Sequence, residues 1–383
     1  MSDRKGLFAA LYRNEVEKLL AHRGRMLLVA FLVIVVGGSL LMLHGQASQR
    51  HMMAVNLRSA ERQVRADRQQ LKMATGRAKS AVEQQLTSDE KTLQEMKQQV
   101  QPTNEVVQLK QLKAGLKSIP VADRGSTLEQ IATTQYMVGH GLTRYNPRTE
   151  TAFRLDGQVL GGITLLVFAL LAVGIGGDRV SQELEGGTWG VLLLHAPARR
   201  KIYLAKLSAS LSILWGFIVS SALGFFVLGS LFFGIGSPMV PHVVGLHLGF
   251  QPGTVPPQLT VLGSKFHILP QWQYDLAALG LAMLALGVLT SIAVGLSMAF
   301  GSTIFAFIVG AVLVISGLFA EHAGAWAVID PTTHLVLMED WTGALAFQTG
   351  IPWLSLGTGL AVVGAWALAS VAFGILWSRR LDV

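Results

Sequence analysis

The chain has 383 residues, of which 51% are apolar and only 14% are charged, and this composition is typical of a membrane protein rather than a soluble one. Its formal net charge of +8 does not indicate nucleic-acid binding, because no basic patch is interleaved with aromatic residues. The absence of cysteine excludes disulfides, thiolate metal sites and cysteine nucleophiles.

The N-terminal segment, residues 1–25, predicts an amphipathic helix on the inner membrane surface. Its basic residues suit anionic headgroups, and we expect Arg13, Lys18, Arg23 and Arg25 to anchor it there. DNA binding by the same face is the less favoured alternative. The apolar run at 26–43 is long enough to cross about 30 Å of hydrocarbon. No small-residue cleavage pattern follows it, so we expect a retained membrane helix.

Residues 44–158 form a polar insertion. Leu57, Val64 and Leu71 repeat every seven residues, and Leu86 and Leu93 repeat in a shifted register, which predicts a coiled-coil-like stalk or a helical hairpin. Thr87 and Glu90 match a capping box, where a second helix would begin. The sequence does not assign a structure to residues 121–158.

Five further apolar runs follow the insertion. They cover residues 159–177, 207–233, 274–300, 303–320 and 353–377, and the segments beside them are 178–206, 234–273, 321–351 and the tail 378–383. The fold class predicted is therefore an all-α membrane protein with six transmembrane helices and a helical, coiled-coil-like extracytoplasmic insertion between the first two.

The orientation follows from the basic residues. Lysine and arginine gather in the N-terminal segment, in residues 178–206 and at Arg379 and Arg380, whereas 234–273 and 321–351 contain only Lys265 between them. By the positive-inside rule both termini are cytoplasmic. The spans are nearly free of ionisable residues, Asp275 lying at the start of the fourth, and this disfavours an ion-coupled transporter.

Residues 178–206, which we name the charged loop, have the most distinctive pattern. Gly186 and Gly187 should break a helix, Thr188 should cap a new turn that presents Trp189, and Pro197 should end it. Such a short amphipathic loop with a fixed bend is the form expected where a membrane protein docks a soluble partner.

At these positions the sequence resembles permeases of ABC-2 type transporters. The residues that match are Asp178, Glu183, Glu185, Gly187, Thr188, Leu193, Leu194, Pro197, Arg199, Arg200 and Lys206. The resemblance implies that the charged loop couples the chain to a separate ATP-binding subunit. Glu183 and Glu185 would meet donors on that subunit, and Trp189 with Leu192 to Leu194 would fill its groove. Arg199, Arg200 and Lys201 would hold the loop at the headgroups.

The resemblance also implies the partners. Because the chain has no G-x-x-x-x-G-K-[ST] motif, we expect it to bind no cofactor and not to be an enzyme, with ATP and magnesium held in the partner subunit. We expect a second permease subunit, the same chain or a similar one, and the inner or plasma membrane of a prokaryote, with export as the more common direction. No catalytic or metal site is expected, since the spacing of His242, His247 and His267 is not that of a helical metal pair.

Two alternatives belong to other classes. The chain would be a membrane-anchored sensor or assembly scaffold if the coiled-coil insertion, which suits docking of an extracytoplasmic protein, were its working part. A membrane enzyme without a recognisable site is the other. The substrate and the role of residues 44–158 stay open.

Overall fold

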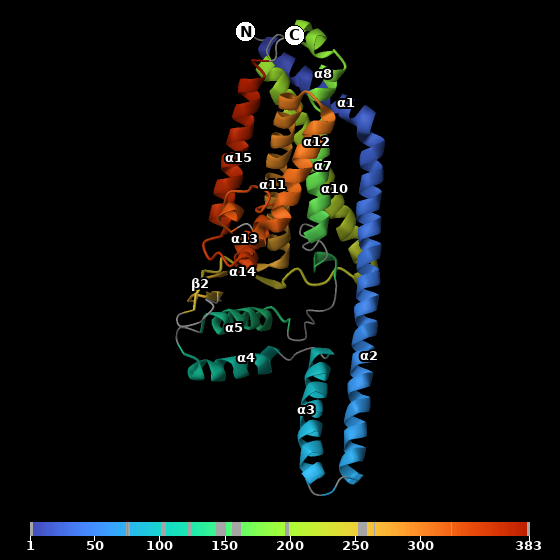
Figure 1. Ribbon diagram of the computed structural model, residues 1–383, viewed down its shortest axis with the longest axis vertical. Helices are drawn as coiled ribbons and strands as arrows, with labels where there is room; N and C mark the ends of the chain where they lie inside the picture. The colour runs from blue at the N-terminus through green and yellow to red at the C-terminus, as the bar shows by residue number, and fades with distance from the viewer. Residues whose placement is uncertain are drawn as a thin grey trace.

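The computed structural model describes residues 3–380 except 74, 76, 101–104, 121–123, 143–150, 155–161, 196–198, 252–258, 264 and 323. The start of the predicted second span and Pro197 lie outside the described residues. Helices dominate the described chain, which confirms the predicted helical class. Apolar helices form a bundle at one end of the molecule, and polar helices extend from the other end (Figure 1).

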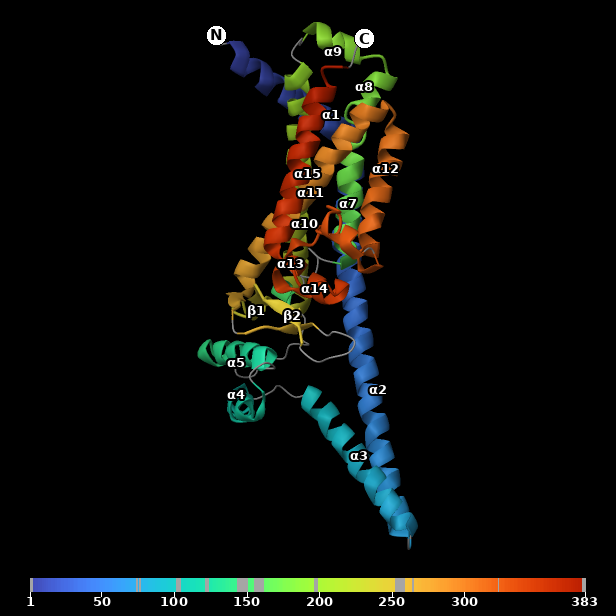
Figure 2. The same cartoon turned by 60° about the vertical axis from the view of Figure 1, so that its left-hand side comes forward.

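One continuous helical rod begins the chain. It consists of α1 (Asp3–Leu32), the π-helical η1 (Val33–Gly37) and α2 (Gly38–Met73). The first turns of α1 cross the end of the bundle that holds both termini, and α2 extends far beyond the bundle (Figures 1 and 2). The predicted boundaries at 25 and 43 therefore fall inside this rod, because no proline interrupts the helix between the polar and apolar stretches.

The other apolar helices are α7 (Gly162–Gly176), α10 (Arg199–Phe233), α11 (Gln271–Phe300), α12 (Thr303–Ser316) and α15 (Leu356–Trp377). Within the described residues, five helical stretches are long and apolar enough to cross a membrane: Arg23–Gly45, Leu165–Glu185, Arg199–Phe233, Gln271–Phe300 and Leu356–Trp377. The chain is thus a multi-pass membrane protein. The apolar helix Thr303–Phe319 is shorter, so the sixth span stays a prediction.

The bundle core lies where α7, α10 and α11 meet. Phe168, Leu214 and Leu286 are fully buried there. Gly310 of α12 faces Val173 of α7 so closely that an added Cβ would lie 2.5 Å from a valine methyl. A small residue at this position therefore lets α12 pack directly on α7, in agreement with the role expected of glycine in membrane helices.

The polar insertion includes a helical hairpin, one of the two forms that the heptads predict. α3 (Arg77–Val100) packs along α2, and two ion pairs join them, Arg68–Glu90 at 2.7 Å and Lys97–Glu61 at 3.0 Å. The predicted helix start at Thr87 is wrong. Thr87 lies inside α3, where its hydroxyl donates to the Glu83 carbonyl, and the Glu90 side chain binds Arg68 instead of capping.

A layer of short elements covers the end of the bundle opposite the termini. It contains α4 (Glu105–Gly115), η2 (Leu116–Ser118), α5 (Arg124–Gly139) and four strands, β1 (Pro241–Val244), β2 (Leu248–Phe250), β3 (Leu259–Val261) and β4 (His267–Pro270). β1 pairs antiparallel with β4, and β2 with β3. The predicted loop 234–273 therefore contains two two-stranded sheets, and α5 packs against a strand of each.

The segment between α12 and α15 is also folded. It comprises η4 (Gly317–His322), η5 (Gly324–Val328), α13 (Leu337–Thr342) and α14 (Ala344–Thr349). His334 and Asp340 are fully buried in it and pair at 3.0 Å. This buried pair ties η5 to α13, since the second ring nitrogen of His334 lies 3.2 Å from the Val328 carbonyl.

Candidate functional site

The charged loop is built from two short helices between two long ones. α7 ends at Gly176, a turn follows, α8 (Ser181–Glu185) and α9 (Trp189–His195) come next, and α10 starts at Arg199. Arg199, Arg200, Lys201 and Lys206 therefore lie on the first turns of α10, not in an irregular loop.

Gly187 makes the bend between α8 and α9. Its φ of +65° lies in the left-handed region, which favours glycine, and this explains why the chain turns here. The predicted cap at Thr188 takes a different form. Its carbonyl accepts from the Leu192 N–H at 3.1 Å and opens α9, while its hydroxyl donates to the Glu183 carbonyl at 3.5 Å.

A cluster of four charges, of which Lys206 and Glu15 are buried and Lys18 is exposed, ties α8 to α1 and α10. The Lys206 ammonium, 1% exposed, lies 2.8 Å from Glu183 and 3.1 Å from both carboxylate oxygens of Glu15. Lys18 adds contacts of 3.1 Å to Glu183 and 3.6 Å to Glu15. Burial alone would lower the pKa of Lys18, but the two carboxylates outweigh burial and raise it. The cluster is neutral overall, which is the condition under which buried charges are tolerated.

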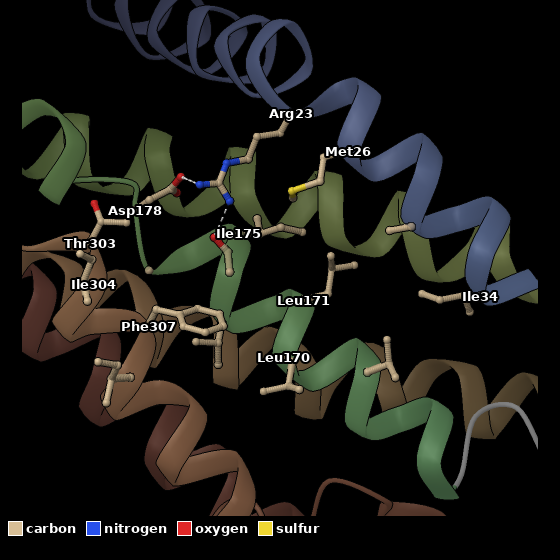
Figure 3. Close-up of a pocket in the computed structure, with 16 residues that line it drawn as sticks. Arg23, Met26, Ile34, Leu170, Leu171, Ile175, Asp178, Thr303, Ile304 and Phe307 are labelled. Atoms are coloured by element: carbon tan, nitrogen blue, oxygen red, sulfur yellow. Dashed lines mark hydrogen bonds and ion pairs between the residues drawn. The ribbon is translucent and has the colours of Figure 1, made fainter.

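A second charge cluster lies at the turn after α7. Asp178 is buried and pairs with both Arg23 and Arg179, the latter at 2.8 Å. Figure 3 shows the Arg23 side chain reaching from α1 toward Asp178, and its guanidinium also donates to the Gly174 carbonyl at 3.1 Å. This cluster therefore fixes the C-terminal end of α7 against α1.

Hydrogen bonds fasten the other side of α8 to α11 and α12. The Thr303 N–H and hydroxyl donate to the Glu185 carboxylate at 2.9 and 3.3 Å, so Glu185 satisfies a donor at the start of α12. The Ser297 hydroxyl accepts from the N–H groups of Val180 and Ser181 at 3.0 and 2.9 Å. Charged and polar contacts thus connect α8 and the preceding turn with α1, α10, α11 and α12.

The apolar side chains of α9 divide into a buried and an exposed set. Trp189 is 3% exposed and packs with Tyr203 of α10 and Met298 of α11. Leu194, 84% exposed, and Val191, 56% exposed, lie three residues apart and so share one face of the helix. α9 is therefore attached through Trp189 and presents an apolar face outward.

Two grooves flank these clusters. One of about 470 Å³ lies between the start of α1 and the α8–α9 bend, and it is lined by Leu7, Leu11 and Val191 with Lys18 and Glu183. The other, about 540 Å³, runs between α1, α7 and α12. Figure 3 shows the second groove, with the Arg23–Asp178 pair at one end and apolar side chains along the rest.

Comparison with known proteins gives the family. A family model described as ABC-2 family transporter protein matches residues 9–382. The chain belongs to the ABC-2 transporter family. Neither the curated proteins nor the solved structures gave a match. ABC-2 family permeases generally work with an ATP-binding subunit, and the chain is a membrane component of an ABC transporter.

Several residues with predicted roles lie inside this ABC-2 family member. Asp178, Trp189 and Lys206 are buried, so in this conformation they do not form an outward-facing docking surface. Glu183 and Glu185 bind partners in their own chain. The exposed residues of the predicted coupling set are Glu185, Gly187, Thr188, Leu194 and Arg200, while Leu193 is partly buried and Arg199 donates to the Arg379 carbonyl at 3.0 Å.

The residues predicted to bind lipid headgroups fall into two groups. Lys18 and Arg23 belong to the two charge clusters, because their side chains point toward buried carboxylates. Arg13 is exposed and pairs with Glu17 at 2.8 Å, and Arg25 is exposed. Anchoring by Arg13 and Arg25 stays a prediction.

Glu15, Ser297 and Thr303 were not among the predicted site residues. The sequence could have indicated Glu15, since an acidic residue three positions before Lys18 lies on the same helix face. It could not have indicated Ser297 or Thr303, because their contacts with α8 join residues more than 110 positions apart.

Proposed function

We propose that this chain is the permease subunit of an ATP-driven ABC-2 exporter, and that the charged loop couples it to a separate ATP-binding subunit. The observation that carries the proposal is the construction of α8 and α9. Three polar clusters fasten this unit to α1, α10, α11 and α12, and the apolar face with Leu194 points outward.

The docking surface in this proposal is the exposed face of α9 with the groove beside it. Leu194 and Val191 supply apolar contact area, and Leu7 and Leu11 of α1 form the opposite wall of the groove. An apolar surface flanked by charge is the usual composition of a protein interface. Glu183, Glu185 and Trp189 act behind this surface in the proposal, as the residues that receive its motion.

Movement would pass from the loop into the bundle through the polar clusters. A displacement of α8 acts on α1 and α10 through Lys206, on α1 through Asp178, and on α12 through Glu185. α1 and α12 form two walls of the groove in Figure 3, so their separation would change. Together with a second permease subunit, the same chain or a similar one, this face would form the translocation path.

The membrane topology in this proposal has six spans, with α12 as the fifth in chain order. Both termini lie at the same end of the bundle (Figures 1 and 2), as an even number of crossings requires. The basic residues favour the cytoplasm for that end and the inner or plasma membrane of a prokaryote as the location. The α2–α3 hairpin then extends on the extracytoplasmic side, where it suits an extracytoplasmic protein partner. ATP and magnesium belong to the partner subunit.

The test is a mild-detergent pull-down of the tagged chain from its native membrane, assayed for ATP hydrolysis. Leu194→Asp places a charge on the exposed face of α9 and should remove most of the co-purifying ATPase. Met73→Asp is the matched control, because Met73 is 80% exposed at the far end of α2 and should retain the ATPase. A well-folded wild-type chain with no ATPase would overturn the proposal and favour the sensor or scaffold acting through the hairpin.

A further inference from the structure

A second cavity lies at the end of the bundle opposite the charged loop. Its volume is about 310 Å³, and it is lined by residues of α4, α5, β1 and the first turn of α11. The polar groups that line it are Glu105, Thr133, Arg154, His242 and Gln271. These residues come from five separate segments of the chain, and none belongs to the proposed coupling machinery.

Glu105 is the residue in this cavity whose buried carboxylate points to a ligand with hydrogen-bond donors. Glu105 is the first residue of α4 and is only 4% exposed. Its Oε2 atom has no hydrogen-bond partner among the described residues. Burial raises the pKa of this carboxyl group. A buried carboxylate oxygen without a donor is costly, so a ligand that brings N–H donors would relieve an existing penalty.

The neighbouring groups also offer acceptors. The Thr133 hydroxyl donates to the Glu129 carbonyl at 2.9 Å, which leaves its oxygen free to accept. Gln271 donates its amide hydrogens to Asp275 and to the Phe153 carbonyl, so its carbonyl oxygen accepts from His242 Nε2 at 2.7 Å.

His242 is therefore protonated on Nε2, and a neutral ring has Nδ1 as an acceptor. Burial, together with the nearby charge of Arg154, lowers the pKa of His242 and keeps the ring neutral. The hydrogen bond that His242 donates to Gln271 raises the pKa, but burial outweighs it.

The cavity thus combines a buried carboxylate and neutral acceptors with one guanidinium, that of Arg154. We propose that it binds a small zwitterionic group, an ammonium carrying N–H donors beside a carboxylate or phosphate. Glu105 accepts from the ammonium, and Arg154 supplies the charge that attracts the anion. Such a group can come from a free metabolite or from an ethanolamine lipid headgroup, since Gln271 is the residue at which the membrane helix α11 begins. The site is independent of ATPase coupling.

The first experiment uses soluble probes on the full chain in phosphatidylglycerol nanodiscs. Calorimetric titration compares phosphoethanolamine and glycine, which carry N–H donors, with phosphocholine and glycine betaine, whose methylated nitrogens have none. One charge-assisted hydrogen bond corresponds to about tenfold in affinity or more, so the donors should bind at least that much tighter.

Glu105→Gln should remove this preference for the donors. The substitution is nearly isosteric at an oxygen that no described residue contacts by a hydrogen bond, so the unfolding temperature should not fall. Glu129→Gln on α5, outside the cavity lining, is the matched control and should keep the preference.

The second experiment identifies a lipid source. The chain is reconstituted with equal phosphatidylethanolamine and phosphatidylcholine, and retained lipid is measured by native mass spectrometry. A preference for the N–H donors in the soluble titration indicates that the ligand is a free zwitterion. Retention of phosphatidylethanolamine but not of phosphatidylcholine, which Glu105→Gln should abolish, indicates that the ligand is the lipid headgroup. The proposal is overturned if neither experiment distinguishes ammonium from trimethylammonium, or if Glu105→Gln leaves the preference unchanged.

Discussion

Lys206 is a buried residue whose positive charge is needed to neutralise the carboxylates beside it. Its ammonium is the counterion of two buried carboxylates, Glu15 and Glu183, that Lys18 alone would not neutralise. We predict that Lys206→Met lowers the free energy of unfolding by about 3–5 kcal/mol, because it leaves an uncompensated buried charge. The measurement is denaturant unfolding of the purified chain. Arg200→Met in the first turn of α10 is the control and should change stability little, since Arg200 is exposed. Equal stability of the two variants would contradict the role of the cluster.

His334 gives a prediction on pH. Burial alone would lower its pKa, but the hydrogen bond and charge of Asp340 outweigh burial, and the pKa lies above its ordinary value of 6.5. Asp340, whose own pKa burial raises, and the Val328 carbonyl are both acceptors and so favour the protonated ring.

The folded chain therefore holds this proton more tightly than the unfolded chain. The stabilisation is complete below the ordinary histidine pKa of about 6.5 and is lost as pH rises through the folded value. We expect the unfolding temperature to fall with rising pH over that window, and Asp340→Asn to flatten the slope. His247→Gln, at an exposed histidine outside the pair, should leave the slope unchanged. An unaltered slope in Asp340→Asn would refute the assignment.

At the scale of elements, the α8–α9 bend depends on one glycine. An added Cβ at Gly187 would meet no atom within 4 Å, so substitution acts through the backbone alone. We predict that Gly187→Ala destabilises the bend by about 1–2 kcal/mol, the cost of left-handed backbone in an L-residue, and reduces the co-purifying ATPase. Gly187→Asn should be milder, because asparagine tolerates this conformation. Equal retention of ATPase by wild type and Gly187→Ala would show that the bend is dispensable.

Elements with a strong internal pattern could be predicted from the sequence. The lengths of the apolar runs predicted the ends of α11 and α15 to within a few residues. The repeat at Leu57, Val64 and Leu71 predicted a stalk or a hairpin, of which the structure has the hairpin. A local pattern gave a wrong prediction where its side chains have other hydrogen-bond partners in the folded chain. Thr87 and Glu90 match a capping box, but the chain continues as helix and Arg68 binds the glutamate across the hairpin. The predicted charged loop, residues 178–206, includes the first turns of α10, which starts at Arg199. The direction of each side chain was not predictable, since Glu185 binds Thr303 and Lys206 binds Glu15 only after the bundle has assembled.

At the scale of the whole molecule, the site at each end of the bundle has its own chemistry. The end with the termini combines two charge clusters with an exposed apolar face, which suits a protein partner. The opposite end has a cavity with a buried carboxylate oxygen that has no partner in the described part of the chain, which suits a small ligand. α11 extends from one end to the other, with Gln271 lining the cavity and Ser297 binding the turn before α8. One continuous helix therefore touches both sites.

The proposed transmission from the loop to the groove predicts a distance change that can be measured. The chain contains no cysteine, so spin labels can be placed on cysteines introduced at Ala30 of α1 and Ile308 of α12, which line the groove of about 540 Å³ from two sides. A non-hydrolysable ATP analogue added to the complex with its ATPase should shift the 30–308 distance distribution, because the clusters at Asp178 and Glu185 connect both helices to the loop.

Two controls make that measurement decisive. Labels at Arg62 and Gln94, on the two helices of the α2–α3 hairpin, should keep their separation, because the hairpin extends away from the bundle (Figure 1). In Leu194→Asp, which should not retain the ATPase, the analogue should leave the 30–308 distance unchanged. If the ATPase binds nucleotide in the wild-type complex and the 30–308 distance stays the same, then α8 and its polar clusters do not transmit motion to this groove. The loop would then be a docking site alone.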